Sequence, residues 1–87
     1  MTIELFGMAR HLAGSATLEV GGERLTRREL VRALATIPEM AGNVVDAERE
    51  TFVLPNLLLL DGRHMPGDDE PFSAADRPCV LFLASGG

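Results

Sequence analysis

The chain ends in two adjacent glycines, and this terminus is the part of the sequence best suited to chemistry. Gly86 and Gly87 follow an apolar stretch and a single serine, Ser85. A terminal carboxylate is ionised at neutral pH and is a poor electrophile, but adenylation with ATP would give its carbon a good leaving group. A sulfur nucleophile would then produce a thiocarboxylate, itself a nucleophilic sulfur source, and an amine would produce an amide. Because glycine has no Cβ, such a tail fits a narrow channel in another protein.

The rest of the chain lacks the residue patterns of an enzyme. Two histidines and one cysteine, His11, His64 and Cys79, do not have the spacing of a metal-ligand cluster, and no glycine-rich phosphate loop precedes the main predicted helix. None of the serines lies in a nucleophile elbow. The acidic run 68–70 is interpreted as a solvated turn, with a catalytic carboxylate pair as the alternative. We therefore expect no self-contained active site, no metal and no bound cofactor, so an outside enzyme that consumes ATP must activate the terminus.

Length and composition restrict the chain to one small domain. It has 87 residues, a mass of 9.4 kDa and a net charge of −5, which argues against nucleic-acid binding because phosphate-binding surfaces need an excess of basic residues. The longest unbroken apolar run, 57–60, is far shorter than the ~20 residues of a membrane span. A single cysteine and no signal peptide indicate a reducing cytoplasm. All 8 basic residues are arginines. Because the chain has no lysine, none of its side chains can accept an isopeptide bond.

Apolar periodicity predicts the elements of the first half. Residues 2–6 and 16–20 alternate between apolar and polar side chains, as half-buried strands do, and a helical turn is expected between them. The clearest helix begins after Thr26, which with Glu29 fits a capping box, and it ends near Thr36 because the following proline cannot extend it. The polar stretch after it, up to Thr51, is predicted to be a loop with one short turn at most.

The second half predicts a hairpin and a final strand. Residues 56–60 are apolar and precede Asp61-Gly62, a type I′ turn pair, and 79–84 form the last strand. The order of strand, strand, helix and further strands predicts an α+β, β-grasp (ubiquitin-like) fold, with one main helix across a mixed four- to five-stranded sheet. We assign 1–84 to this domain and 85–87 to a flexible C-terminal tail.

Residues 5–14, LFGMARHLAG, resemble the opening of the molybdopterin synthase small subunit, which has an apolar strand followed by a turn carrying Ala-Arg-x-Leu-x-Gly. The capped helix, the strand ending in Asp61-Gly62 and the terminal Gly86-Gly87 also fall where that family has them, and the related thiamine-pathway carriers match less well. The family consists of β-grasp, ubiquitin-like sulfur carriers. The resemblance implies that Gly87 is adenylated by an E1-like enzyme, converted to a thiocarboxylate and used in molybdopterin (molybdenum cofactor) biosynthesis.

The same resemblance implies partners and contact residues. The partners are the E1-like adenylating enzyme, a sulfur donor of the desulfurase or rhodanese type, and the synthase large subunit or another sulfur-accepting enzyme. Gly87 would carry the reacting carbon, and the tail that enters the partner would comprise Ala84, Ser85 and Gly86. The partner-facing surface would consist of Phe6, Arg10, His64 and Leu81.

Strand parity bears on two of these surface residues. Phe6 leaves its strand on the side opposite to the apolar residues that we expect to face inward. If Leu81 faces outward, Val80 and Phe82 face the core, and Cys79 lies on the outer face as a buried or unreactive thiol. The alternative for Phe6 and Leu81 is an ordinary place in the core.

The sequence departs from the family pattern in ways that affect the choice of partner. His64 stands where an apolar contact residue is common, Ala74-Ala75-Asp76 replaces Asp-Gly-Asp, and Phe82-Leu83 replaces prolines before the tail. Related carriers serve thiamine, cysteine, tRNA-thiolation and secondary-metabolite pathways, which are alternative destinations for the sulfur. A ubiquitin-like modifier conjugated through Gly87 and a plain protein-interaction domain are the remaining alternatives.

Overall fold

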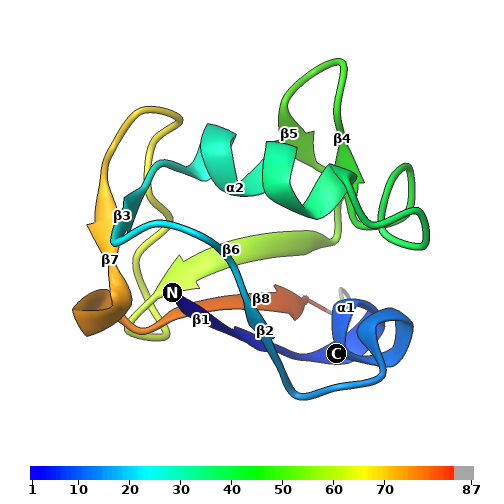
Figure 1. The fold of residues 1–87 in the computed structure, drawn as a ribbon, viewed down its shortest axis with the longest axis horizontal. Coiled ribbons are helices and arrows are strands. Elements are labelled where there is room, and N and C mark those ends of the chain that lie inside the picture. The colour runs from blue at the N-terminus through cyan, green and yellow to red at the C-terminus, as the bar shows by residue number, and fades with distance from the viewer. Residues whose placement is uncertain (84–87) are drawn as a thin grey trace.

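A four-stranded sheet forms the base of the molecule in the computed structural model, which describes residues 1–83 (Figure 1). The strand order is β2 (Thr17–Glu19), β1 (Thr2–Leu5), β8 (Pro78–Phe82) and β6 (Asn56–Leu60). β1 and β8 run parallel, and the other neighbouring pairs are antiparallel. The final strand of the chain therefore lies between the first strand and β6, which makes the sheet mixed as predicted.

The main helix, α2 (Arg27–Ala35), lies across one face of this sheet (Figure 1). The predicted capping box is present: the Thr26 hydroxyl accepts the Glu29 N–H at 3.2 Å, and the Glu29 carboxylate accepts the Thr26 N–H at 2.9 Å. These bonds satisfy backbone donors that the first turn of a helix otherwise leaves unpaired. Leu30, Val31 and Leu34 recur at helical spacing and are fully buried, so α2 turns its apolar face to the sheet.

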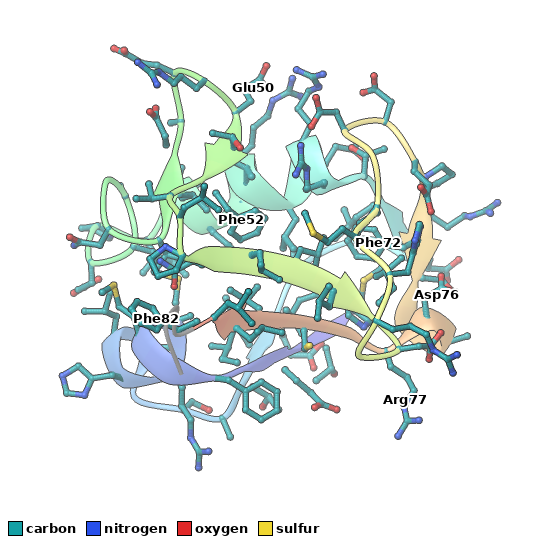
Figure 2. All side chains as sticks on the ribbon, turned by 180° about the vertical axis from the view of Figure 1, so that it is seen from behind. Glu50, Phe52, Phe72, Asp76, Arg77 and Phe82 are labelled. Carbon is teal, nitrogen blue, oxygen red and sulfur yellow. The ribbon has the colours of Figure 1, made fainter. Side chains whose placement is uncertain are left out.

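The core lies between α2 and the inner face of the sheet. Each central strand contributes alternate residues to it, because side chains along a strand point to opposite faces in turn: Ile3, Leu5, Leu58, Leu60 and Val80. Phe52 and Phe72 are buried in the same cluster (Figure 2). This arrangement confirms the predicted α+β, β-grasp architecture with one main helix packed on a mixed sheet.

A short helix, α1 (Gly7–Ala13), connects β1 to β2, where a helical turn was expected. It begins at Gly7 with φ +62° and is closed by Gly14 with φ +69°, whose N–H bonds the Arg10 carbonyl at 3.0 Å. Both glycines hold left-handed conformations that other residues adopt at a cost. Because α1 follows β1 directly, it brings the residues of the family-like opening to one end of the sheet.

Two small strand pairs were not predicted. β4 (Val45–Asp46) and β5 (Thr51–Phe52) form a hairpin where a loop was expected, and β3 (Arg24–Leu25) pairs with β7 (Phe72–Ser73) ahead of the 3-10 turn η1 (Ala74–Asp76). Each strand has two residues, which is too short for an alternation to be recognised in the sequence. Their buried members, Val45, Phe52, Leu25 and Phe72, extend the core around α2.

The turn at Asp61-Gly62 follows the prediction. Both residues have positive φ, +52° and +71°, as a type I′ turn requires, and the Arg63 N–H bonds the Leu60 carbonyl at 3.1 Å. The return after the turn is limited to a single bridge between Leu60 and His64. The predicted hairpin is therefore confirmed at its turn and is much shorter than a full strand pair.

One inward-facing prediction is wrong. Phe82 was expected to face the core with Val80, but it is 38% exposed. It ends β8 and lies beside α1 (Figure 2), where a Cβ placed on Gly7 would be 2.4 Å from the Phe82 Cβ. Strand parity correctly assigns Val80 to the core, because the Val80 side chain is fully buried. Phe82 is the last residue of β8 and lies beyond the core cluster, so the alternation of side chains along the strand no longer predicts burial there.

The acidic run 68–70 is an exposed turn, as expected, and its carboxylates form ion pairs. Asp68 pairs with Arg27, the Asp69 carboxylate accepts from Arg28 at 3.3 Å, and Glu70 bonds His64 at 2.7 Å. On the other side of α2, Glu50 accepts from Arg32 at 2.6 Å and from Arg28. The carboxylates of Asp68, Asp69 and Glu50 attach two loops to α2, whereas Glu70 pairs with His64 outside the helix. The alternative of a catalytic carboxylate pair finds no support in this geometry.

Candidate functional site

The face of the sheet opposite α2 carries an apolar surface. The register of β6 and β8 places Leu57 directly opposite Leu81 and Leu59 opposite Cys79. All four side chains alternate with core residues of their own strands, and the two β6 leucines and Leu81 are half-buried. Since residues opposite each other on one face have Cβ atoms about 5 Å apart, these side chains form a continuous surface.

Phe6 extends this surface on the other side of β8. The parallel register pairs Glu4 with Cys79 and Leu5 with Val80, and the Phe6 N–H continues the ladder by donating to the Val80 carbonyl at 2.9 Å. Phe6 therefore lies beside Leu81 and is 44% exposed. We call Phe6, Leu57, Leu59, Cys79 and Leu81 the outer apolar face. The predicted outward orientation of Phe6 agrees with this geometry.

Cys79 lies on the outer face and is buried, as expected. The side chain is 8% exposed and lines a depression of about 320 Å³ with Glu4 and Phe6. Burial raises the pKa of the Cys79 thiol, and the neighbouring Glu4 carboxylate raises the same pKa further. The thiolate is the reactive form of cysteine, so a raised pKa favours the less reactive thiol form.

The tail leaves the domain from the end of β8, beside the start of β6. The Leu83 N–H bonds the Pro55 carbonyl at 3.0 Å, which holds the last described residue against the loop before β6. Residues 84–87, which include Ala84, Ser85 and Gly86 and the predicted reacting residue Gly87, lie outside the described residues. The outer apolar face thus borders the point from which the tail departs.

The other two predicted contact residues lie at separate places. Arg10 is exposed on α1, at the same end of the sheet as Phe6. His64 lies near Leu60, which pairs with Pro78 at the opposite end of β8, about 13 Å along the strand from Phe82. The hydrogen bond from His64 lowers the pKa of the Glu70 carboxyl. The structure therefore brings Phe6, Leu81 and Arg10 toward the tail and places His64 away from it.

Leu57 and Leu59 are contact candidates that sequence reasoning missed. Their strand reads Asn56-Leu57-Leu58-Leu59-Leu60, without any alternation that separates an inner from an outer face. Asn56, Leu58 and Leu60 are buried beneath α2, which leaves the other two on the outer face. The missed signal is the unbroken run itself, since apolar residues on both faces of an edge strand mark a second surface that needs cover.

The described residues lack two kinds of feature. Within 1–83, no group of three or more His, Cys, Asp or Glu residues is placed to hold a metal ion. In the same part of the chain, no helix is long and apolar enough to cross a membrane. The outer apolar face is the exposed apolar surface that borders Leu83, the last described residue.

The sheet order β2-β1-β8-β6, with parallel central strands and a single helix across one face, defines a β-grasp, ubiquitin-like domain. The chain is similar over 100% of its length to the crystal structure of SAMP1 from Haloferax volcanii, with a TM-score of 0.71, 24% identity and 98% of that chain covered. At this identity the likeness establishes the fold. The sequence matches no family model and has no significant match among curated proteins.

Proposed function

We propose that the chain is a sulfur carrier that works through a thiocarboxylate at Gly87 and donates sulfur in molybdopterin biosynthesis. The observation that carries the proposal is the position of Leu83, the last described residue: it follows β8 directly and lies beside an outer apolar face that suits a partner enzyme. The ubiquitin-like fold and the resemblance of residues 5–14 to the synthase small subunit support the same function.

The chemistry requires two partner-catalysed steps. The Gly87 carboxylate attacks the α-phosphorus of ATP on an E1-like enzyme and releases pyrophosphate. Hydrosulfide then attacks the acyl carbon, expels AMP and loses its proton, which leaves the thiocarboxylate. Where a desulfurase or rhodanese supplies the sulfur as an enzyme persulfide, the terminal sulfur attacks the acyl carbon and expels AMP to give an acyl disulfide, and a second thiol then attacks the enzyme's sulfur, which releases the thiocarboxylate and leaves a disulfide. The resulting thiocarboxylate enters the acceptor enzyme, where its sulfur is the nucleophile. In this scheme the described residues supply docking contacts, and the partners supply the catalytic groups. We place the reaction in the cytoplasm.

Intact mass spectrometry tests the proposal directly. The purified chain is incubated with ATP, a candidate E1-like enzyme and sulfide, and we expect a mass increase equal to the difference between sulfur and oxygen, mapped to Gly87. The variant lacking Gly87 should remain folded and unmodified. A Cys79→Ser variant should gain the same mass as the natural chain, because the sulfur is attached to the terminus. An unchanged mass with several such enzymes contradicts the proposal.

The outer apolar face has its own test within this function. Replacing Phe6, which is 44% exposed, with aspartate should weaken binding of the synthase large subunit, because it places a charge in an apolar contact. Met8 is 38% exposed and belongs to α1 rather than to the face, so Met8→Asp is the matched control. If the Phe6→Asp and Met8→Asp variants bind the large subunit equally well, the outer apolar face is not the docking surface.

A protein modifier joined through Gly87 to a partner's lysine is the second candidate, and the likeness to SAMP1, a ubiquitin-like small archaeal modifier protein, favours it. It uses the same activated terminus, with an amine in place of sulfide. It predicts conjugates of higher mass that resist denaturation, and the absence of lysine means that the chain cannot extend such conjugates on its own side chains. A plain interaction domain predicts instead that partner binding survives removal of 85–87.

A further inference from the structure

An apolar depression lies where the described part of the chain ends. It has a volume of about 410 Å³ and is lined by Leu54, Pro55, Leu57 and Leu83, and we call it the Leu54 depression. Leu57 also belongs to the outer apolar face, so the depression continues that face toward the last described residue. None of the four lining side chains carries a charge or a hydrogen-bonding group. The depression therefore suits an apolar group.

Leu54 is the most exposed of these leucines. Its side chain is 78% exposed, and that of Leu83 is 56% exposed. A single exposed leucine is ordinary on a protein surface, but here two exposed leucines and the half-buried Leu57 surround one hollow. Covering a leucine side chain with apolar atoms strengthens binding by roughly a factor of ten or more. Leu54 therefore has the largest contribution to make to a contact at this place.

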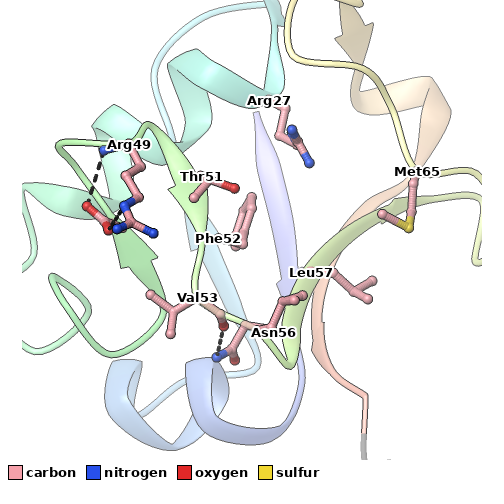
Figure 3. Close-up of a pocket in the computed structure, with 10 residues that line it drawn as sticks. Arg27, Arg49, Thr51, Phe52, Val53, Asn56, Leu57 and Met65 are labelled. Atoms are coloured by element: carbon pink, nitrogen blue, oxygen red, sulfur yellow. Dashed lines mark hydrogen bonds and ion pairs between the residues drawn. The ribbon is translucent and has the colours of Figure 1, made fainter.

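The loop that presents Leu54 is held by hydrogen bonds on both sides of this residue. Before it, the Val53 carbonyl accepts from the Asn56 N–H at 3.0 Å and from the Asn56 side-chain amide at 2.9 Å (Figure 3). After it, the Pro55 carbonyl accepts from the Leu83 N–H at 3.0 Å. Asn56 is 1% exposed and is the one polar residue buried within 1–83. These bonds preorganise the loop, so little conformational entropy is lost when a partner covers Leu54.

The position of the Leu54 depression brings it close to any enzyme that acts on Gly87. Four residues, 84–87, follow Leu83, and four residues span at most about 14 Å. A partner interface of ordinary size buries roughly 800 Å² on each protein, which corresponds to a patch about 16 Å in radius. A patch of that size centred on Leu83 includes the depression. An enzyme that holds the α-phosphate of ATP against Gly87 therefore has the depression within its contact surface.

We propose that the adenylating enzyme places a large apolar side chain, such as that of leucine, methionine or phenylalanine, in the Leu54 depression, with Leu54 as its main contact. The inference rests on the proposed function, because it assigns this surface to the enzyme that activates Gly87. Adenylation precedes both the transfer of sulfur and the formation of an amide, so both candidate functions require this occupant. Leu54 does not belong to the reacting tail, so it contributes to binding rather than to the chemical step.

Steady-state ATP–pyrophosphate exchange with the full chain tests this inference. The concentration of the chain is varied at a fixed amount of an E1-like enzyme, and the exchange rate reports adenylation of Gly87. We expect Leu54→Ser to raise the KM for the chain about tenfold and to leave kcat within about twofold, because it removes an apolar contact away from the reacting carbon. Leu54→Met keeps an apolar side chain of similar volume and should stay within about twofold of the natural KM. Since Leu54 is exposed, neither change should disturb the fold.

Met65→Ser is the matched control. Met65 is 55% exposed, follows His64 beyond the end of β6, and lines neither the Leu54 depression nor the outer apolar face, so this variant should keep the natural KM. A KM for Leu54→Ser equal to that of the control overturns the inference. A lowered KM also overturns it, since it would show that the chain's own tail occupies the depression. Weaker binding of the large subunit with unchanged exchange kinetics would assign the depression to the acceptor instead and overturn the inference as well.

The inference and the proposed function fail in different ways. If the natural chain gives no exchange with several E1-like enzymes and gains no mass with sulfide, the proposed function fails and the inference fails with it. If the natural chain is adenylated and gains mass at Gly87 while Leu54→Ser behaves like the control, the inference alone fails. A dimer of the natural chain that Leu54→Ser dissociates, detected by analytical ultracentrifugation, would show that a second copy covers the depression and would likewise overturn the inference alone.

Discussion

Replacing Gly7 with alanine introduces two separable costs at the junction of β1 and α1. Gly7 has φ +62°, and the left-handed conformation costs about 1–2 kcal/mol for a residue with a Cβ. The new Cβ would also lie 2.4 Å from the Cβ of Phe82, far inside van der Waals contact, and relief of such overpacking typically costs about 1–3 kcal/mol. We expect a loss of about 3 kcal/mol in the free energy of unfolding, which lowers Tm by roughly 12–24 °C in a domain of this size.

Gly14→Ala is the matched control for this experiment. Gly14 has a similar φ of +69°, but a Cβ there has nothing within 4 Å. Alanine at Gly14 should therefore cost only the conformational part, about 1 kcal/mol. The chain has no Trp and no Tyr, so urea unfolding is best followed by far-UV circular dichroism. The difference between the two variants measures the contact with Phe82.

A second change at Phe82 identifies the clashing atom. Phe82→Ala retains the Cβ that the new methyl group meets, so it should not rescue Gly7→Ala, whereas Phe82→Gly removes that atom and should recover the overpacking part of the loss. If Gly7→Ala and Gly14→Ala destabilise equally, or if Phe82→Ala rescues as well as Phe82→Gly, the reasoning is refuted.

Three further predictions follow from contacts in the fold. Thr26→Ala removes the capping box and should cost about 1 kcal/mol in urea unfolding; a loss below a quarter of that would show that the cap contributes little. The hydrogen bond from Arg32 lowers the pKa of Glu50, so this pair stabilises the fold above the ordinary glutamate pKa of about 4.3 and is lost as the pH falls through the lower folded pKa. In the Glu50→Gln variant the free energy of unfolding should therefore fall less steeply as the pH is lowered. An unchanged dependence on pH in acid would contradict a stabilising role for the Glu50–Arg32 pair. Burial and a raised pKa should make Cys79 react with iodoacetamide at pH 8 about tenfold more slowly in the folded chain than in urea; equal rates would show that the thiol is accessible.

Local chemistry made several features predictable. Thr26 and Glu29 specify a helix start whatever the helix packs against, because both capping bonds join residues within one turn. Asp61-Gly62 specifies a turn because both residues tolerate positive φ. The outward orientation of Phe6 followed from the parity of a strand whose inner residues are plainly apolar. In each case the evidence and the consequence lie within a few residues of each other.

Features that depend on distant segments were not predictable. The strand pairs β4–β5 and β3–β7 are too short to carry a pattern, and they form because Val45, Phe52, Leu25 and Phe72 complete the core around α2. The Phe82 side chain is not buried in the core because α1 occupies the space beside the end of β8. The outer positions of Leu57 and Leu59 became visible only when α2 was seen to cover the other face of β6.

The sequence by itself determined the two helices, the four strands of the main sheet, the class of fold and the residue at which chemistry is expected, because helix caps, alternation and a terminal Gly-Gly are local properties of the chain. Tertiary structure decided where these parts meet. Pairing of β8 between β1 and β6 joins residues more than seventy positions apart, and it places Phe6, Leu81 and Leu57 on one face beside the start of the tail.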